Sequence, residues 1–191
     1  MFRKFVSALL ALAIILPPAP SWAQNDLVSS LLRHKRQASE APAITEISGR
    51  VVGVADGDTI TVLDADQHQH RIRFLGIDAP EKAQAFGQRA KQALSNLVYA
   101  KPVRCACIGT DRYERALCKV FVGAHTDVNL AMVTAGLAWH NKPYEHSQAV
   151  SDRATYASAQ RAAQAERSGL WVDPQPVAPW EFRRASRQQS Q

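Results

Sequence analysis

Long apolar runs are almost missing from this sequence of 191 residues. The longest one, residues 5–16, has only about half of the ~20 residues that a membrane-spanning helix needs. Nothing after residue 23 is apolar for long enough to cross a bilayer, so we expect no stable membrane insertion of the mature chain. The chain also has no internal repeat, and its length leaves room for one well-buried domain with flanking segments.

Cysteine and histidine are scarce as well. The three cysteines, Cys105, Cys107 and Cys118, allow at most one disulfide and leave one free thiol. The six histidines lack the spacing of metal ligands, except that His68 and His70 alternate in a predicted turn. Chance exposure explains that pair better than metal binding does.

The N-terminus has the pattern of a secretory signal. A charged start with Arg3 and Lys4 precedes the apolar run, and the small residues Ser21 and Ala23 follow a proline-rich stretch. This order predicts a cleaved signal peptide over residues 1–23. An uncleaved membrane anchor is the alternative. We therefore expect a bacterial protein that is periplasmic or secreted, where calcium is available and disulfides can form.

The charge balance is mildly basic. Residues 1–23 contain two of the 23 basic residues and none of the 17 acidic ones, so the remaining chain has a net charge of +4. Such an excess suits a polyanionic partner but does not identify one. Residues 24–45 are polar and predict a flexible leader, in which the basic cluster at 33–36 is solvated or, alternatively, contacts nucleic acid or an acidic surface.

The rest of the chain predicts an α+β domain over residues 46–172. Strand-like runs broken by turn residues occur at 47–55, 59–63, 71–77, 103–108 and 116–122, and helical spacing at 86–100, 127–136 and 151–168. Five short strands with a helix after the third favour a small, partly open β-barrel of the OB-fold type, with two more helices beside it. The tail, residues 173–191, is expected to lie across the surface. Trp180 and Phe182 would anchor it to the barrel or, alternatively, stack on nucleic-acid bases.

Three carboxylates gather at the ends of two predicted strands. Asp58 opens the second strand, Asp78 closes the third, and Glu81 follows it. Antiparallel neighbours joined by a short turn bring those ends together. Oxygen ligands of this kind suit Ca²⁺. Ordinary turn chemistry is the alternative for each aspartate, and we keep that interpretation for Asp56, which precedes a turn glycine.

Arginines occur where phosphate binding would need them. Arg73 interrupts an apolar strand and requires an anionic partner, either a nearby carboxylate or a phosphate. The loop 109–115 adds Arg112, Tyr113 and Arg115, although a solvated hairpin loop would look similar. Guanidinium groups bind phosphate with two parallel hydrogen bonds. The combination of cation ligands, a further carboxylate and two arginines favours phosphodiester chemistry.

These segments resemble the staphylococcal nuclease (thermonuclease) family. The matching motifs are Asp56-Gly-Asp-Thr59, Arg73-Phe-Leu-Gly-Ile-Asp-Ala-Pro-Glu81, Phe86-Gly87, Asp111-Arg-Tyr-Glu-Arg115, Gly136-Leu-Ala138 and Gly169-Leu-Trp171. The resemblance covers about residues 46–172. It implies a five-stranded OB-fold barrel with three helices and a calcium-dependent endonuclease that cuts DNA and RNA and leaves 3′-phosphate ends. We expect the protein to act as a monomer.

The resemblance also implies roles for the acidic segment. Asp58, Asp78 and the carbonyl oxygen of Ala79 would bind Ca²⁺, and Glu81 would position or deprotonate the attacking water.

The basic residues receive roles in the same way. Arg73 and Arg115 would hold the scissile phosphate. Arg112 and Tyr113 would contact a neighbouring phosphate, while Tyr144 would line the nucleotide pocket.

Three positions depart from the family pattern. Ala79 stands where the best-known member has threonine, which matters little if only the main-chain oxygen binds metal. Glu114 replaces the usual glycine before the second arginine, adding a carboxylate beside a phosphate site. Gln160 stands where glutamate is common, and we expect it to affect stability more than catalysis.

The cysteines lie on two adjacent predicted strands. We favour a disulfide between Cys105 and Cys118, with Cys107 buried and free, because of the oxidising compartment. Pairing of Cys107 with Cys118 and buried thiols without a disulfide are the alternatives.

Two other classes of function compete with the enzyme. A non-catalytic OB-fold module could bind nucleic acid in the same groove, although such a module has no need of the complete acidic and arginine set. An exported envelope interaction module would use the leader and tail and would be indifferent to calcium and EDTA.

Overall fold

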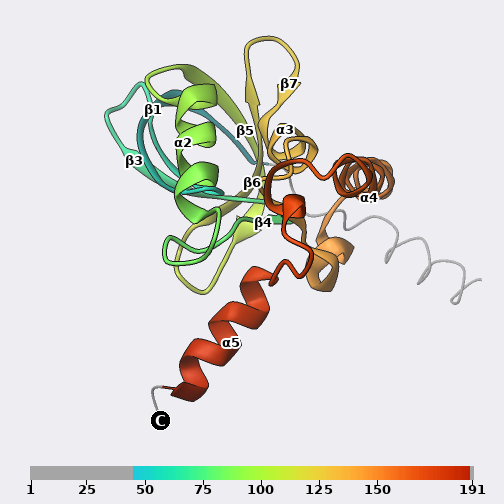
Figure 1. Ribbon diagram of the computed structural model, residues 1–191. Helices are drawn as coiled ribbons and strands as arrows, with labels where there is room; N and C mark the ends of the chain where they lie inside the picture. The colour runs from blue at the N-terminus through green and yellow to red at the C-terminus, as the bar shows by residue number, and fades with distance from the viewer. Residues whose placement is uncertain (1–44, 190–191) are drawn as a thin grey trace, which may run out of the picture. The chain divides into compact units, whose positions relative to one another are not determined.

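Five strands close into a β-barrel in the computed structural model, which describes residues 45–189 (Figure 1). The order is β3-β2-β1-β5-β6, and a parallel pairing of β3 with β6 closes the barrel. The expected OB-fold-type α+β architecture is confirmed. The predicted signal peptide, residues 1–23, and all but the last residue of the predicted leader lie outside the described residues. The barrel strands are β1 (Thr45–Asp56), β2 (Thr59–Leu63), β3 (Gln69–Phe74), β5 (Pro102–Thr110) and β6 (Ala116–Val122).

Strand β1 pairs with two neighbouring strands, one along each half of its length. Its first half pairs with β5, and its second half pairs with β2 through two register irregularities, between Val51 and Gly53 and between Val54 and Asp56. Such irregularities bend and twist a strand, which lets one strand pass from one side of a barrel to the other. The bend brings Asp56 and the β1–β2 turn to the end of the barrel where the site lies.

The barrel interior is filled by alternate residues of every strand. Apolar side chains that are almost fully buried come from β1, β2, β3, β5 and β6, as the period of two along a strand requires. They include Val51, Ile60, Val62, Ile72, Phe74, Val103, Cys105, Cys107, Cys118 and Val120.

Three helices cover the barrel. Helix α2 (Gly87–Val98) buries Ala90, Leu94 and Val98, which repeat at the four-residue spacing of one helix face. Helix α3 (Val128–Thr134) is capped by Asp127, whose carboxylate accepts a hydrogen bond from the Leu130 amide at 3.0 Å. Helix α4 (Val150–Ala165) packs beside α3 (Figure 1).

Several short elements were not expected from the sequence. They are β4 (Ile77–Asp78), β7 (Thr126–Asp127), β8 (Trp139–His140), the 3-10 helices η1 (Lys142–Ser147) and η2 (Gly169–Val172), and helix α5 (Pro179–Gln189). Strand β4 pairs with β8, so that Asp78 lies opposite Trp139. The tail is therefore a helix for most of its length. Among residues 45–189, no helix has the length and apolar character of a membrane span.

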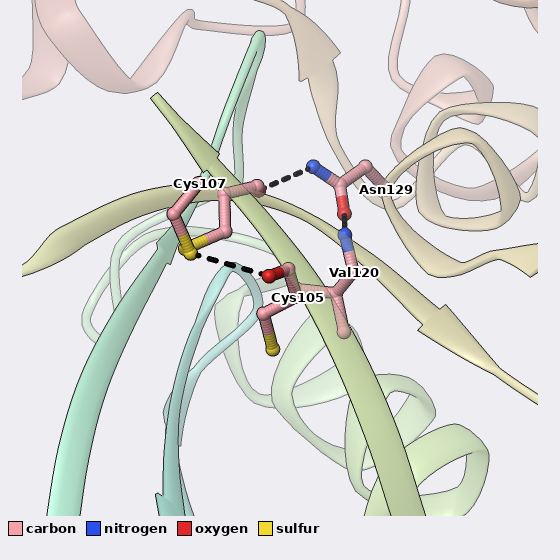
Figure 2. Close-up of a disulfide and its surroundings, with 5 residues drawn as sticks. Cys105, Cys107, Val120 and Asn129 are labelled. Carbon is pink, nitrogen blue, oxygen red and sulfur yellow. Dashed lines mark hydrogen bonds between the residues drawn. A yellow bond between two sulfur atoms is a disulfide. The ribbon is translucent and has the colours of Figure 1, made fainter. Parts of the chain in front are cut away.

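The predicted pairing of the cysteines was wrong. The disulfide joins Cys107 to Cys118, and Cys105 is buried and free (Figure 2). Both Cys105 and Cys107 point into the barrel, but in the β5–β6 register Cys107 lies directly opposite Cys118, with their Cα atoms 4.0 Å apart, whereas Cys105 lies opposite Val120. Burial raises the pKa of the Cys105 thiol to about 12, which leaves it unreactive as a nucleophile.

Loss of the disulfide should destabilise the barrel. The bond closes a short segment, with 11 residues of sequence separation, and a loop of this size corresponds to about 2–4 kcal/mol. We expect the double variant Cys107→Ala, Cys118→Ala to lose that much free energy of unfolding, measured by urea denaturation, and Cys105→Ala to lose less.

Thiol titration supplies the control for this prediction. Denatured, unreduced wild-type protein should show one reactive thiol. Three reactive thiols would mean that the cysteines are not joined in the native protein.

Candidate active site

The turn between β1 and β2 places Asp58 at the mouth of the barrel. The carboxylate of Asp56 accepts a hydrogen bond from the Asp58 amide at 3.2 Å, which is the turn-capping role expected for Asp56. Gly57 packs so closely on Ala79 and Ala90 that a Cβ atom would overlap both side chains. The turn is thereby held against the segment that follows β4, and the amide of Ala79 donates to the Asp58 carboxylate at 2.7 Å.

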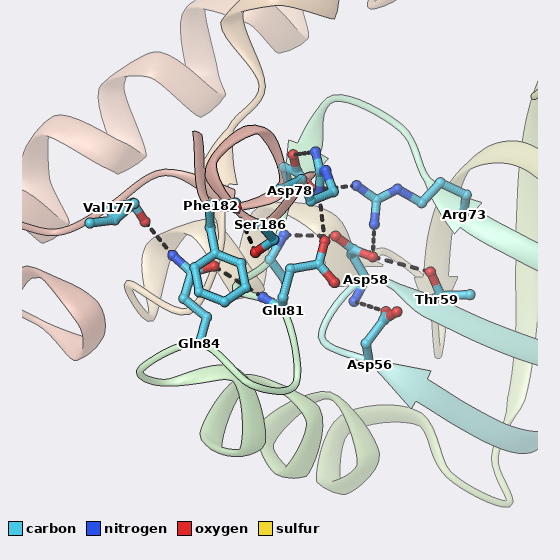
Figure 3. A network of polar contacts seen from close by, with 12 residues as sticks. Asp56, Asp58, Thr59, Arg73, Asp78, Glu81, Gln84, Val177, Phe182 and Ser186 are labelled. Atoms are coloured by element: carbon cyan, nitrogen blue, oxygen red, sulfur yellow. Dashed lines mark hydrogen bonds and ion pairs between the residues drawn. The ribbon is translucent and has the colours of Figure 1, made fainter. Parts of the chain in front are cut away.

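Asp58 and Asp78 converge on one guanidinium group. Each aspartate is 1% exposed, and Arg73 forms ion pairs with both, at 2.6 Å from its Nη2 to Oδ1 of Asp78 (Figure 3). The β2–β3 register, in which Thr59 pairs with Arg73, explains why the two strand ends meet. The Thr59 hydroxyl also donates to Asp58 at 3.1 Å. The structure therefore brings these three predicted site residues together.

Glu81 lies in a tight loop that leads into α2. The Glu81 amide donates to the side-chain oxygen of Gln84 at 3.2 Å, and the Gln84 amide donates back to the Glu81 carbonyl at 2.9 Å. A side chain at Gly87 would overlap the Glu81 carbonyl, so glycine is needed where the loop packs on the helix start. The Glu81 carboxylate is more than a third exposed and faces the same region as Asp78.

Arg115 reaches the site from the β5–β6 loop. Asp111 holds it with an Nε–Oδ2 hydrogen bond of 2.8 Å and an Nη2–Oδ2 ion pair of 2.6 Å. Its Nη1 lies 3.5 Å from the Thr59 hydroxyl, which itself contacts Asp58. Burial opposes ionisation of Asp111, but the bonds from Arg115 outweigh burial and lower the Asp111 pKa. Arg115 is thus oriented by Asp111 and lies one contact away from Asp58, through the Thr59 hydroxyl.

Glu114 has the left-handed backbone that glycine would adopt freely, with φ +59°. Its side chain is exposed, and the turn is closed by a hydrogen bond from its amide to the Asp111 carbonyl at 3.0 Å. The same turn exposes Arg112 and Tyr113, whose guanidinium and phenol groups meet at 2.9 Å. The substitution therefore leaves Arg115 in place and keeps its added carboxylate in solvent.

Tyr144 lies farther along the chain in η1, which follows β8. Its side chain is largely exposed and its ring neighbours that of His146, with centroids 6.4 Å apart. The described residues show no contact between Tyr144 and the aspartates. Gln160 supports the same region, since its side chain accepts a hydrogen bond from the His140 amide at 2.8 Å. This contact agrees with the structural role expected for Gln160.

One residue of the site was not predicted. Arg183, from α5, contacts Asp78 Oδ2 at 2.6 Å and Glu81 Oε1 at 2.7 Å. Its hydrogen bond to Asp78, opposed by burial and aided by Glu81, raises the Arg183 pKa, so the group stays charged. The sequence did contain a helix signal here, with Pro179 and Glu181 in the first turn and Arg187 in the last. It contained no signal for the contact itself.

The donor set fits a hard divalent cation. Two buried carboxylates need positive charge close by, and here they share the Arg73 guanidinium, Asp58 through Nη1 and Asp78 through Nη2. Carboxylate oxygens with a main-chain carbonyl such as that of Ala79 are typical calcium ligands. A second cluster of possible ligands, Asp64, Asp66 and His68, lies in the β2–β3 turn, where Asp64 accepts hydrogen bonds from the amides of Asp66 and His68. Turn formation accounts for that cluster.

Comparison with known proteins identifies the family. The family described as "Staphylococcal nuclease homologue" matches residues 71–173. The chain belongs to the staphylococcal nuclease family. An "Uncharacterized endonuclease" of Haemophilus influenzae is 46% identical over 135 residues, which is 71% of this chain and 72% of that protein. "Protein ParB" of Escherichia coli is 42% identical, covering 76% and 84% of the two chains, and "Micrococcal nuclease" of Shigella flexneri is 38% identical, covering 76% and 86%.

Within the staphylococcal nuclease family match lie Arg73, Asp78, Glu81 and Arg115, while Asp58 precedes its first residue and Arg183 follows its last. Asp58 is nevertheless part of the same barrel end, because β2 pairs with β3 along its whole length. The recognised resemblance is thus confirmed for the family and the fold. Arg183 is a feature of this chain that the family match does not cover.

Proposed function

We propose that this chain, an endonuclease of the staphylococcal nuclease family, is an exported, calcium-dependent enzyme that hydrolyses both DNA and RNA as a monomer and leaves 3′-phosphate ends. The observation that carries the proposal is the meeting of buried Asp58 and Asp78 with Arg73, next to Glu81 and Arg115. All of these side chains belong to one chain. Cation ligands, a carboxylate base and two phosphate-binding arginines are the groups that metal-assisted phosphodiester hydrolysis requires.

Each residue receives a chemical role from its position. Glu81, which is partly exposed, accepts a proton from the water that attacks phosphorus, while the bond from phosphorus to the 5′-oxygen breaks and that oxygen takes a proton from solvent. Arg73 and Arg115 donate hydrogen bonds to the scissile phosphate and stabilise the charge that grows on its oxygens. Calcium held by Asp58, Asp78 and the Ala79 carbonyl would add positive charge at the same phosphate.

Substrate recognition is proposed to depend on phosphates and on stacking. Arg112 and Tyr113 lie exposed on the β5–β6 loop, and Tyr144 is exposed on η1. Such groups bind backbone phosphates and the faces of bases, which DNA and RNA share. This explains why the proposal includes both nucleic acids.

Export is supported by two independent observations. The N-terminal sequence has the order of a signal peptide, and the barrel contains a Cys107–Cys118 disulfide. Disulfides persist in oxidising compartments such as the periplasm. Fractionation of cells expressing the full chain tests this part of the proposal.

A cleavage assay tests the activity. We expect purified protein to degrade plasmid DNA and single-stranded RNA with calcium and to degrade neither with EDTA. The products should become substrates for polymerase extension only after a phosphatase removes the 3′-phosphate. Binding of nucleic acid without cleavage would support the non-catalytic OB-fold module instead, and the absence of both would support an envelope interaction module.

A further inference from the structure

Helix α5 places a second guanidinium group, that of Arg183, on Asp78, which Arg73 also contacts, and on Glu81. The Arg183 guanidinium spans Asp78 and Glu81, with Nη2 at 2.6 Å from Asp78 Oδ2 and Nη1 at 2.7 Å from Glu81 Oε1 and 3.2 Å from Asp78 Oδ1. Asp78 is thus enclosed between Arg73 and Arg183. One guanidinium group occupies acceptor oxygens of both the proposed calcium ligand and the proposed base.

The start of α5 is fixed next to the site. Ala178 and Pro179 are buried, and the ring of Trp180 lies edge-on to Trp139, with centroids 5.7 Å apart. Trp139 is the residue that pairs with Asp78 between β4 and β8. The preceding segment is tied to the Glu81 loop, since the Gln84 side chain donates to the Val177 carbonyl (Figure 3). These contacts of residues 177–180 therefore position Arg183 next to Asp78.

The outer part of α5 is exposed to solvent. The side chains of Arg183 and Glu81 are 39% and 37% exposed, and a cleft lined by Lys82, Phe182 and Arg187 opens beside them. The Arg183–Glu81 ion pair is exposed on both sides and is therefore weak and screened by salt, whereas in the Arg183–Asp78 pair only the guanidinium group is exposed. A divalent cation or a polyanion can therefore compete with the Arg183 contacts.

We propose that α5 is an autoinhibitory arm, in which Arg183 competes with the divalent cation for Asp78 and occupies Glu81 until the arm is displaced. The inference rests on the proposed function, because it assigns Asp78 to cation binding and Glu81 to proton transfer. A nuclease with this arm is inactive at low calcium and gains activity when calcium and the phosphate backbone together release α5. The nucleic acid assists release because the freed helix carries Arg183, Arg184 and Arg187, which its phosphates attract.

Calcium binding by full-length mature protein tests the arm without reference to activity. Wild type, Arg183→Gln and Arg184→Gln are titrated with calcium in a calorimeter without nucleic acid. Arg184 is exposed on the same helix, so its replacement makes the same charge change as a matched control. We expect Arg183→Gln to bind calcium about 5-fold or more tightly than wild type, and Arg184→Gln to bind like wild type.

Hydrogen exchange and cleavage complete the test. Calcium should increase amide exchange over residues 183–189 in wild type, and Arg183→Gln should cleave plasmid faster at limiting calcium but equally fast at saturating calcium. Equal calcium affinity in all three proteins would overturn the proposal that α5 is an autoinhibitory arm. Slower cleavage by Arg183→Gln at unchanged calcium affinity also overturns it, since Arg183 would then serve the substrate. If none of the three proteins cleaves at any calcium concentration, the proposed function itself fails. If all three cleave but bind calcium equally, only the autoinhibitory arm fails.

Discussion

Replacing Glu81 with glutamine should lower the rate of phosphodiester cleavage by about 100- to 10,000-fold, the contribution typical of a general base. The amide keeps the size of the side chain and its contact to solvent but cannot accept a proton from water. The loss should appear in kcat and should persist at saturating calcium, where competition by Arg183 no longer matters. Single-turnover cleavage of a labelled oligonucleotide measures it.

Stability and a matched variant control this experiment. Glu81 is partly exposed, and its described side-chain ion pair is with Arg183. The free energy of unfolding of Glu81→Gln should therefore lie within about 1 kcal/mol of the wild-type value. Glu166→Gln, which changes an exposed carboxylate at the end of α4, should cleave like wild type. A folded Glu81→Gln protein that cleaves within threefold of wild type would contradict the role of Glu81.

Replacing Arg73 with alanine should affect both catalysis and stability. Loss of a phosphate-binding donor is expected to reduce cleavage by about 100- to 1,000-fold. Without calcium, the same change leaves Asp58 and Asp78 buried without the guanidinium that they share. Removing one partner of a buried ion pair costs about 3–5 kcal/mol, and the remaining pair of Asp78 with Arg183 places the expected loss near the lower value.

Calcium distinguishes this expectation from general damage to the barrel. If Asp58 and Asp78 bind calcium, saturating calcium should restore much of the stability lost by Arg73→Ala but little of the activity. Urea denaturation in calcium and in EDTA measures the difference. Arg71→Ala, at an exposed position two residues earlier on β3, is the control and should change neither property strongly. An equal loss of stability with and without calcium would mean that the aspartates do not share a cation.

The contiguous part of the site could be predicted because neighbouring strands determine it. Asp58 and Asp78 lie at the ends of strands joined through short turns, and alternation of apolar residues locates those strands. Arg73 could be singled out because a charge between buried residues requires a partner. The sequence could not decide between a carboxylate and a phosphate as that partner, and the structure shows two carboxylates.

The short elements were missed for a different reason. Strands β4 and β8 have two residues each, so periodicity cannot reveal them, and their pairing joins residues far apart in sequence. That pairing matters because it places Trp139 beside Asp78 and provides the surface on which Trp180 packs. The tail was expected only to lie across the surface, whereas tertiary contacts with Trp139 and Gln84 hold the start of α5.

The amino-acid sequence by itself determined the barrel strands, the three covering helices, the family and the candidate residues from Asp58 to Arg115, because these depend on local periodicity, turn chemistry and contiguous motifs. Only the tertiary structure decided which cysteine pairs with Cys118, since Cys105 and Cys107 share one face and cross-strand register alone distinguishes them. It alone also placed Arg183 on Asp78, across 105 residues of sequence. Such a contact depends on how α5 packs against the barrel, and no local pattern encodes that packing.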